Sequence, residues 1–350
     1  MELIFCGDNA RKRQFLEYRA GLYRGDANSF CTDEFVVKDM ICQNTDFARE
    51  CEVMPVLVTH GGNVVAEAAI IFNPKLEYGQ VAFFEAEMGA AVAADMIINE
   101  AKRLAKVRGM SKIVIGLNGH ISYGVGILTE GFEHKNSFDS IYNKPYYREY
   151  FSHLKSVGLS TYKRKKADME FLLKYPAGGV RVRRANMRKF EQEAELMRQI
   201  CEKTIGKTFL YFPTKGGHFY QLMRDLRPFL KNENLLFAEN REGDTIGFLF
   251  WHPDFNQMLK GGRGYSDVGL ALAYLFKGRK INTAKLNAMG ALSSRATVAL
   301  LNELNAVLGD RFEYVETNFV WDNNVPSTLI NKRFFGKPHR RYEVYIDEVD

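Results

Sequence analysis

At residues 284–309 the chain reads AKLNAMGALSSRATVALLNELNAVLG. Its first part, residues 284–289, alternates apolar and polar side chains, which predicts a β-strand. A loop of small residues follows, and apolar side chains then recur at three- and four-residue spacing as far as Leu308. That spacing predicts an amphipathic helix, and Gly309 stands where such a helix is expected to end.

The residues after Gly309 continue the same alternation of element types. We expect a strand over residues 312–320, a Trp-Asp-Asn-Asn segment at 321–324, a helix over 326–335 that ends at Gly336, and a last strand over 340–346. A loop of small residues that enters a helix presents unpaired N–H groups and the positive end of the helix dipole. The stretch therefore suits an anionic group of the size of a pyrophosphate.

This order of elements resembles the acetyl-CoA half of the GNAT acyltransferase superfamily. That superfamily carries Gln/Arg-x-x-Gly-x-Gly/Ala in the loop, where this chain has Ser293-Ser294-Arg295-Ala296 and so keeps an arginine and the small final residue. The resemblance implies that acetyl-CoA or another acyl-CoA is the co-substrate. It also implies a set of cofactor-binding residues: Met289, Ser293, Ser294, Arg295, Ala296 and Asn324. The alternative is that Ser293 and Ser294 only cap the helix and that Asn324 only forms a turn before Pro326.

The chain contains an internal repeat of about 170 to 180 residues. In each half we expect a hairpin, a strand, an amphipathic helix and a further strand: 53–58, 64–72, 81–87, 90–108 and 112–115 in the first half, and 235–240, 245–251, 285–289, 297–308 and 312–320 in the second. Each half then continues with Asn-x-Pro and a helix, which we expect to end at Gly158 and at Gly336. The repeat predicts two domains, residues 1–176 and 177–350, joined by the Pro/Gly stretch around residues 175–179.

Three further segments resemble a group of bacterial tandem GNAT-like proteins. They are Ile115-Gly116-Leu117-Asn118-Gly119-His120, Gly126-Ile127-Leu128-Thr129-Glu130-Gly131-Phe132 and Tyr142-Asn143-Lys144-Pro145-Tyr146-Tyr147. The resemblance implies an α/β class with a mixed α+β sheet, in two tandem domains of the acyl-CoA N-acyltransferase fold. The first-half loop at residues 87–91 lacks a CoA signature, so we expect the first domain to be degenerate and CoA to bind the second.

Acyl transfer to an amine needs a proton acceptor for the amine, a polarised thioester carbonyl and a proton for the departing thiolate. Glu316, on the strand that faces the small-residue loop, is the candidate base, with Asp322 as second choice. The tyrosine that many GNAT enzymes carry in their last helix is absent here, so Tyr342 is the candidate acid. The alternatives are that Glu316 faces solvent and that Tyr342 only packs in the core.

Composition restricts the remaining function classes. The 350 residues carry a net charge of +6, and the chain shows neither a secretory signal nor an apolar run long enough to span a membrane. Five scattered cysteines indicate reduced thiols, and the seven dispersed histidines predict no metal site. We therefore expect a cytoplasmic protein. Two basic clusters, residues 163–166 and 181–189, are interpreted as solvated linkers, so nucleic acid is not expected as a partner.

These observations predict a CoA-dependent N-acyltransferase that acts on a small-molecule amine, with its active site in the second domain. Two alternatives stay open: an aminoacyl transferase of the Fem type that uses aminoacyl-tRNA, and a non-catalytic GNAT-like binding or scaffold protein. The acceptor, the length of the acyl chain and whether the protein is a homo-oligomer are also open.

Overall fold

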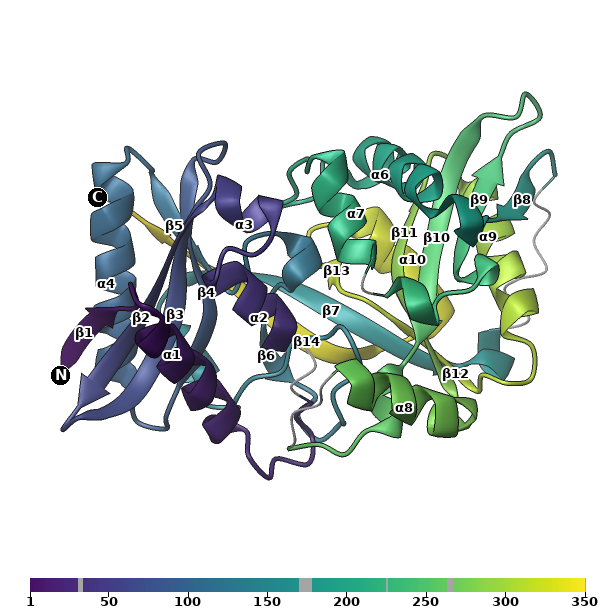
Figure 1. Ribbon diagram of the computed structural model, residues 1–350. Helices are drawn as coiled ribbons and strands as arrows, with labels where there is room; N and C mark the ends of the chain where they lie inside the picture. Colours follow the sequence, from purple (N-terminus) through teal and green to yellow (C-terminus); the bar gives the residue numbers. More distant parts are fainter. Residues whose placement is uncertain (31–33, 170–177, 225, 263–266, 350) are drawn as a thin grey trace. The chain divides into compact units, whose positions relative to one another are not determined.

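The computed structural model describes residues 1–30, 34–169, 178–224, 226–262 and 267–349 (Figure 1). The chain divides into two compact units. Unit 1 holds Met1–Leu159, Leu259–Leu272 and Arg340–Asp350, and unit 2 holds Ser160–Met258 and Ala273–His339. The predicted boundary between residues 176 and 177 lies among residues 170–177, outside the described part of the chain, and stays a prediction.

Unit 1 is a mixed sheet with helices on both faces. Its strand order is β1-β2-β3-β4-β5-β14, and β6 pairs with β14. The strands are β1 (Glu2–Phe5), β2 (Glu52–His60), β3 (Asn63–Phe72), β4 (Tyr78–Ala86), β5 (Lys112–Ile115), β6 (Ile127–Glu130) and β14 (Pro338–Glu348). The helices are α1 (Asn9–Leu22), α2 (Glu34–Ile41), α3 (Asp46–Glu50), α4 (Ala91–Val107) and α5 (Tyr147–Phe151).

Residue alternation divides the two faces of the unit 1 sheet. Even-numbered apolar side chains of β3, from Ala66 to Phe72, form one core with α4 and α5. The odd-numbered side chains of β3 point to the opposite face, and Glu67 is among them. α4 presents alanines and isoleucines at helical spacing to the sheet, as expected of an amphipathic helix. The helix ends, as predicted, just before Gly109, whose backbone has a positive φ.

Unit 2 repeats this construction. Its strand order is β8-β9-β10-β11-β12-β7, with β13 paired to β7. The strands are β7 (Lys155–Lys165), β8 (Arg181–Arg184), β9 (Leu235–Glu239), β10 (Thr245–Pro253), β11 (Thr283–Ala291), β12 (Tyr314–Thr317) and β13 (Val320–Trp321). The helices are α6 (Phe190–Ile205), α7 (Gly216–Arg224), α9 (Ser294–Leu308) and α10 (Val325–Phe335); α8 (Asp267–Lys277) begins among the residues of unit 1 and ends among those of unit 2.

The core of unit 2 lies between the sheet and α6. Phe237, Phe248 and Phe250 pack there with Met197 and Ile200 of α6, while Leu300 of α9 lies against Gly247 on the other face. Gly290 allows α6 to approach the end of β11 closely. A Cβ atom at Gly290 would lie 2.0 Å from Thr204 Oγ1, so a larger residue would push α6 away.

The predicted internal repeat is confirmed at the level of element order. Each unit has an antiparallel hairpin (β2–β3, β9–β10), a third antiparallel strand (β4, β11), a helix (α4, α9) and a strand parallel to the third (β5, β12). The next strand in each sheet comes from the other half of the sequence. Residues 163–165 of β7 pair with β12, and residues 345–348 of β14 pair with β5.

Two expectations about the middle of the chain are wrong. The helix predicted to end at Gly158 ends at Phe151, because the chain from Lys155 onward forms strand β7, and Gly158 lies inside that strand. The basic clusters are not linkers either, since residues 163–165 and 181–184 are strand residues, and several of their cations form ion pairs within unit 2. Arg183 pairs with Glu193 and Glu239, and Arg184 pairs with Glu303.

Candidate functional site

A row of ionisable side chains crosses four neighbouring strands of unit 2. Register places His252 of β10 opposite Lys285 of β11, Lys285 opposite Glu316 of β12, and Glu316 opposite Lys163 of β7. Direct cross-strand partners project from the same face of a sheet, so the four side chains form one ladder. His252, Lys285 and Glu316 are fully buried, whereas the side chain of Lys163 is a quarter exposed. We call these four residues the ionic ladder.

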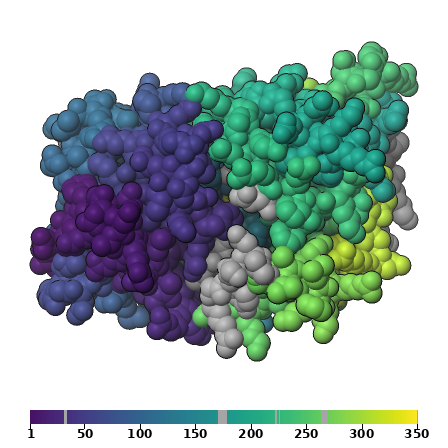
Figure 2. Space-filling model, viewed as in Figure 1, coloured from purple at the N-terminus to yellow at the C-terminus, as the bar shows by residue number. Residues whose placement is uncertain are grey.

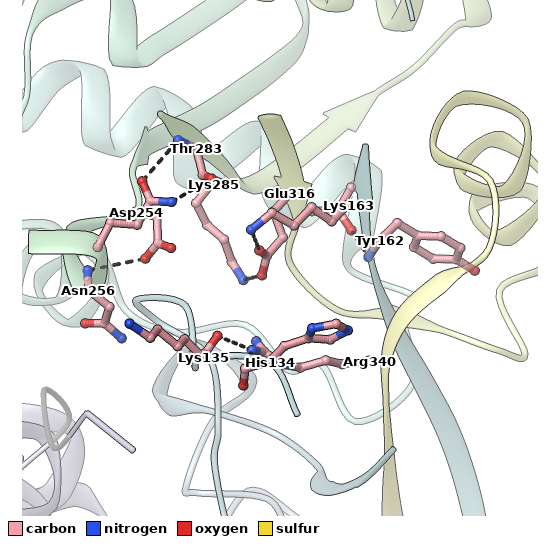
Figure 3. Close-up of polar contacts among 12 residues, drawn as sticks. His134, Lys135, Tyr162, Lys163, Asp254, Asn256, Thr283, Lys285, Glu316 and Arg340 are labelled. Atoms are coloured by element: carbon pink, nitrogen blue, oxygen red, sulfur yellow. Dashed lines mark hydrogen bonds and ion pairs between the residues drawn. The ribbon is translucent and has the colours of Figure 1, made fainter. Parts of the chain in front are cut away.

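Glu316 is the centre of the ionic ladder. Lys285 Nζ donates to Glu316 Oε1 at 3.0 Å, and Lys163 Nζ lies 3.3 Å from Glu316 Oε2 (Figure 3). Burying a carboxylate and an ammonium group costs several kcal/mol for each ion, which is recovered only where the two groups are well paired. The buried ladder therefore depends on this pairing, and its two cations outnumber its one anion.

His252 closes the ladder with a neutral ring. Its Nδ1 lies 2.9 Å from the carbonyl oxygen of Pro253, so Nδ1 carries the proton and donates it to that oxygen. Burial, together with the neighbouring Lys285 cation, lowers the pKa of His252 to about 4. The ring also stacks on Phe255 at a centroid distance of 5.6 Å, which fixes its orientation.

The ladder lies just before the point where β11 and β12 part. The two strands pair in parallel from Thr283 to Leu286, and a last backbone hydrogen bond joins Asn318 N–H to the Leu286 carbonyl at 2.8 Å. Beyond it β11 continues to Ala291 and pairs only with β10, with a register shift opposite Phe250 and Trp251. Carboxyl ends of parallel strands that separate in this way are where α/β proteins bind ligands.

The N-terminus of α9 follows directly from β11. Ser293 is the N-cap, and its Oγ accepts from the Ala296 N–H at 3.2 Å, so the capping role considered above is present. The leading N–H groups, those of Ser294 and Arg295, have no carbonyl one turn earlier to bond. The first turn contains no acidic residue, and it carries Arg295 instead, exposed and without an ion pair among the described residues.

A cation at the N-terminal end of a helix is disfavoured by the helix dipole. The sequence thus places positive charge where the backbone already presents positive charge. An anion bound at this turn would satisfy both, which makes the start of α9 an anion-binding candidate within unit 2.

The remaining predicted cofactor residues occupy the same unit. Met289 lies on β11 opposite Leu249, after the strands have parted. Asn324 is the N-cap of α10, where its Oδ1 accepts from the Ser327 N–H at 3.3 Å. The structure therefore gives Ser293 and Asn324 definite structural roles, and their roles toward a cofactor stay predictions.

The three candidate proton-transfer residues have different settings. Glu316 is fully buried in the ladder, so the solvent-facing alternative for it is wrong. Asp322 is exposed and accepts from Ser160 Oγ at 3.2 Å. Tyr342 is buried in unit 1 on β14, opposite Leu128, so the structure does not bring it together with Glu316 inside one unit. The role of Tyr342 as an acid stays a prediction.

Unit 1 has a corresponding point of strand separation, where side chains of the unit itself bond to the backbone. β4 and β5 pair from Tyr78 to Val81, and a last hydrogen bond joins the Gly116 N–H to the Val81 carbonyl at 3.2 Å. Beyond it the Phe83 N–H donates to Asn118 Oδ1 at 2.9 Å, and the Ala90 N–H, at the start of α4, donates to Tyr150 Oη at 3.2 Å. Two of the donors beside this point in unit 1, the N–H groups of Phe83 and Ala90, therefore already have side-chain partners.

A small cavity of about 30 Å³, partly open to solvent, lies at this point in unit 1, with Phe83, Gly116 and Asn118 in its lining. Glu85 on its wall is ion-paired with Arg19 and accepts from Tyr23 Oη at 2.6 Å and Tyr147 Oη at 2.7 Å. Glu67 of β3 lies opposite Glu85 of β4. Burial, and then the Glu85 carboxylate, raise the pKa of Glu67. These contacts bind α1, the sheet and α5 together, and we interpret the cluster as structural.

Sequence reasoning missed three members of the ladder, Lys163, His252 and Lys285. One signal was present: Lys285 carries a charge within a strand expected beside the cofactor loop, and a lysine is rarely buried unless it is paired. The partners could not be identified because Glu316 lies 31 residues from Lys285, and Lys163, which pairs with Glu316, comes from the other half of the sequence.

No family model matches the chain. Protein YghO of Escherichia coli is 21% identical over 273 residues, covering 72% of this chain and 70% of that protein. The bacterial ceramide synthase of Caulobacter vibrioides is 22% identical over 368 aligned positions, covering 96% of this chain and 94% of that protein.

Among solved structures, a tandem GNAT protein from the clavulanic acid biosynthesis pathway matches with a TM-score of 0.54 at 12% identity, covering 100% of this chain and 99% of that one. A GCN5-related N-acetyltransferase from Sphaerobacter thermophilus matches with a TM-score of 0.53 at 14% identity, covering 99% and 96%. These likenesses show the fold. The protein has the tandem GNAT fold that its sequence predicted.

The buried pair makes a prediction about stability. Lys285→Met removes one partner and leaves Glu316 buried beside Lys163 alone, which we expect to lower the free energy of unfolding by about 3 to 5 kcal/mol. The double variant Lys285→Met/Glu316→Leu removes both charges, and we expect it to be more stable than the single variant. Urea unfolding followed by tryptophan fluorescence measures both. A double variant no more stable than Lys285→Met would contradict the pairing.

The pKa of His252 makes a prediction about pH. Its folded pKa, about 4, lies below the ordinary value of 6.5, so the unfolded chain takes up the proton first as the pH falls. This contribution to stability is complete above pH 6.5 and is lost progressively toward pH 4, by about 3 kcal/mol in all. Wild type should therefore lose about that much more stability between pH 7 and pH 4 than His252→Gln. Equal losses in the two proteins would show that His252 is not buried as described.

Proposed function

We propose that this protein is an acyl-CoA-dependent N-acyltransferase that transfers an acyl group to an amine, with its active site in unit 2. The observation that carries the proposal is the start of α9. There an exposed Arg295 and a first turn without acids follow directly from β11, at the end where β11 and β12 part. The pyrophosphate of an acyl-CoA is an anion of the kind that binds at such a helix N-terminus.

In this proposal the acyl-CoA lies along the end of β11, with Ser293, Ser294, Arg295 and Ala296 at its pyrophosphate and Asn324 near its pantetheine. A backbone N–H of β11 close to Met289 polarises the thioester carbonyl. The amine nitrogen attacks that carbonyl carbon, the carbon–sulfur bond breaks, and an amide and the CoA thiolate are formed.

Two protons move in this reaction. Glu316 accepts the proton that the amine loses, directly or through a water molecule, and Lys285 holds the carboxylate in place at 3.0 Å. The thiolate takes up a proton from solvent as it leaves; Tyr342, the acid expected from the sequence, belongs to unit 1 and stays a prediction.

The relatives support the class of reaction without specifying the substrate. Ceramides are amides, so the protein named bacterial ceramide synthase forms an amide bond, and it matches almost the whole of this chain. We therefore propose that the acceptor is a small-molecule amine and that the acyl group ranges from acetyl to longer chains. Acyl-CoA is a cytoplasmic metabolite, and we place the reaction in the cytoplasm.

Binding is the first test. Isothermal titration calorimetry with acetyl-CoA and octanoyl-CoA should give micromolar binding to the wild type. The double variant Ser294→Glu/Arg295→Glu should bind at least tenfold more weakly, because it places two acids against the anion and removes the cation. Arg181→Glu, an exposed charge reversal on β8 of the same unit, is the matched control and should bind as wild type does.

Turnover separates binding from chemistry. Release of free CoA thiol in the presence of a panel of amines should fall by a factor of about 10² to 10⁴ in Glu316→Gln, while its acyl-CoA affinity stays within about twofold of wild type. Failure of every acyl-CoA to bind would overturn the proposal and favour a scaffold or a tRNA-dependent enzyme. Binding without release for any amine would leave a CoA-binding protein that is not a transferase.

A further inference from the structure

The last two turns of α8 present an apolar face away from the body of unit 2. Tyr274 fixes the helix, because its ring makes edge contacts with Phe229 at 5.4 Å and with Phe255 at 5.5 Å. Helical geometry then places Leu275 roughly 100° and Phe276 roughly 160° around the helix from Tyr274. The side chains that point away from the anchor are therefore apolar.

These side chains are exposed to an unusual extent for their type. Leu275 is 76% and Phe276 is 81% exposed, and Leu272, one turn earlier on the same helix, is 49% exposed. The segment lies on the face of the molecule that Figure 2 shows, in green. Single exposed apolar residues need no explanation, but three on one helical face indicate a surface that contacts another molecule.

Cations surround the end of this face. Lys277, Arg279 and Lys280 follow directly and are exposed. A fourth cation joins them, since Arg311 Nη2 donates to the Gly278 carbonyl at 3.0 Å, while the acid next to it in sequence is Asp310. Exposed apolar side chains with a basic border form the pattern by which peripheral proteins insert into a bilayer interface and attract anionic headgroups.

We propose that the end of α8, residues 272–280, docks on the surface of an anionic phospholipid bilayer. Leu272, Leu275 and Phe276 enter the boundary between headgroups and acyl chains, and the cations contact the lipid phosphates. The charge pattern favours a bilayer over a second copy of this chain, because a twofold dimer through this face would bring two basic borders together.

Docking would take place close to the ionic ladder. Tyr274 of α8 contacts Phe255, and Phe255 stacks on His252 of the ladder. One aromatic ring, that of Phe255, thus separates α8 from the ionic ladder. Membrane docking does not require acyl transfer, so its test is independent of the tests of the proposed function.

Vesicle co-sedimentation of the full chain, without acyl-CoA, tests the docking. We expect binding to vesicles of phosphatidylcholine mixed with phosphatidylglycerol at least tenfold stronger than to phosphatidylcholine alone. Leu275→Ser/Phe276→Ser should weaken binding to the mixed vesicles at least tenfold. Lys277→Gln/Arg279→Gln/Lys280→Gln should weaken it by roughly fivefold for each charge, and added salt should weaken wild-type binding in the same direction.

A matched control exists at the end of α4, where Lys106 and the 74% exposed Val107 repeat the pairing of a cation with an apolar residue. Lys106→Gln/Val107→Ser should bind the mixed vesicles as wild type does. Absence of wild-type binding, or equal binding by wild type and the α8 variants, would overturn the proposal. A dimer in light scattering that Phe276→Ser dissolves, without vesicle binding, would instead identify a second copy as the occupant.

Discussion

The contact between Lys285 and Glu316 is the interaction on which the site in unit 2 depends. It joins two parallel strands one residue before their last pair, Leu286 and Thr317, and both side chains are fully buried with their ions 3.0 Å apart. Two charges in that position must be held together, because either one alone would be costly to bury. The pair therefore fixes the place where β11 and β12 begin to part, and α9 starts from the strand that continues beyond it.

The two units show how one fold carries different site chemistry. Both contain a hairpin, a third strand, a helix and a parallel strand that separates from the third. In unit 1 the donors at the separation bond to Asn118 and Tyr150, and Glu85 is satisfied by Arg19 and two tyrosines. In unit 2 the corresponding region has a basic helix start and an ionic ladder. The comparison explains why a cofactor is proposed for only one of the two.

The sequence predicted the elements whose signals are local. Periodicity and terminal glycines located the ends of α4, α9 and α10 to within a residue, because Gly109, Gly309 and Gly336 follow closely on these helices, whereas α9 begins three residues before its expected start. The repeated order of elements led to the tandem fold. By contrast, β7 comes from the first half of the sequence and pairs with β12, whereas β14 comes from the second half and pairs with β5. No local pattern predicts which sheet such a strand will join. The ladder was missed for the same reason, since Glu316 was selected without Lys163, His252 or Lys285.

The central claim is that acyl-CoA binds at the start of α9 and not at the equivalent helix of unit 1. Hydrogen–deuterium exchange of the whole chain, with and without acetyl-CoA, tests it directly because it reports both helices in one experiment. We expect slower exchange on binding in peptides that cover residues 287–298, and no change in those that cover residues 82–93. Protection confined to residues 82–93 would contradict the account and move the active site to unit 1.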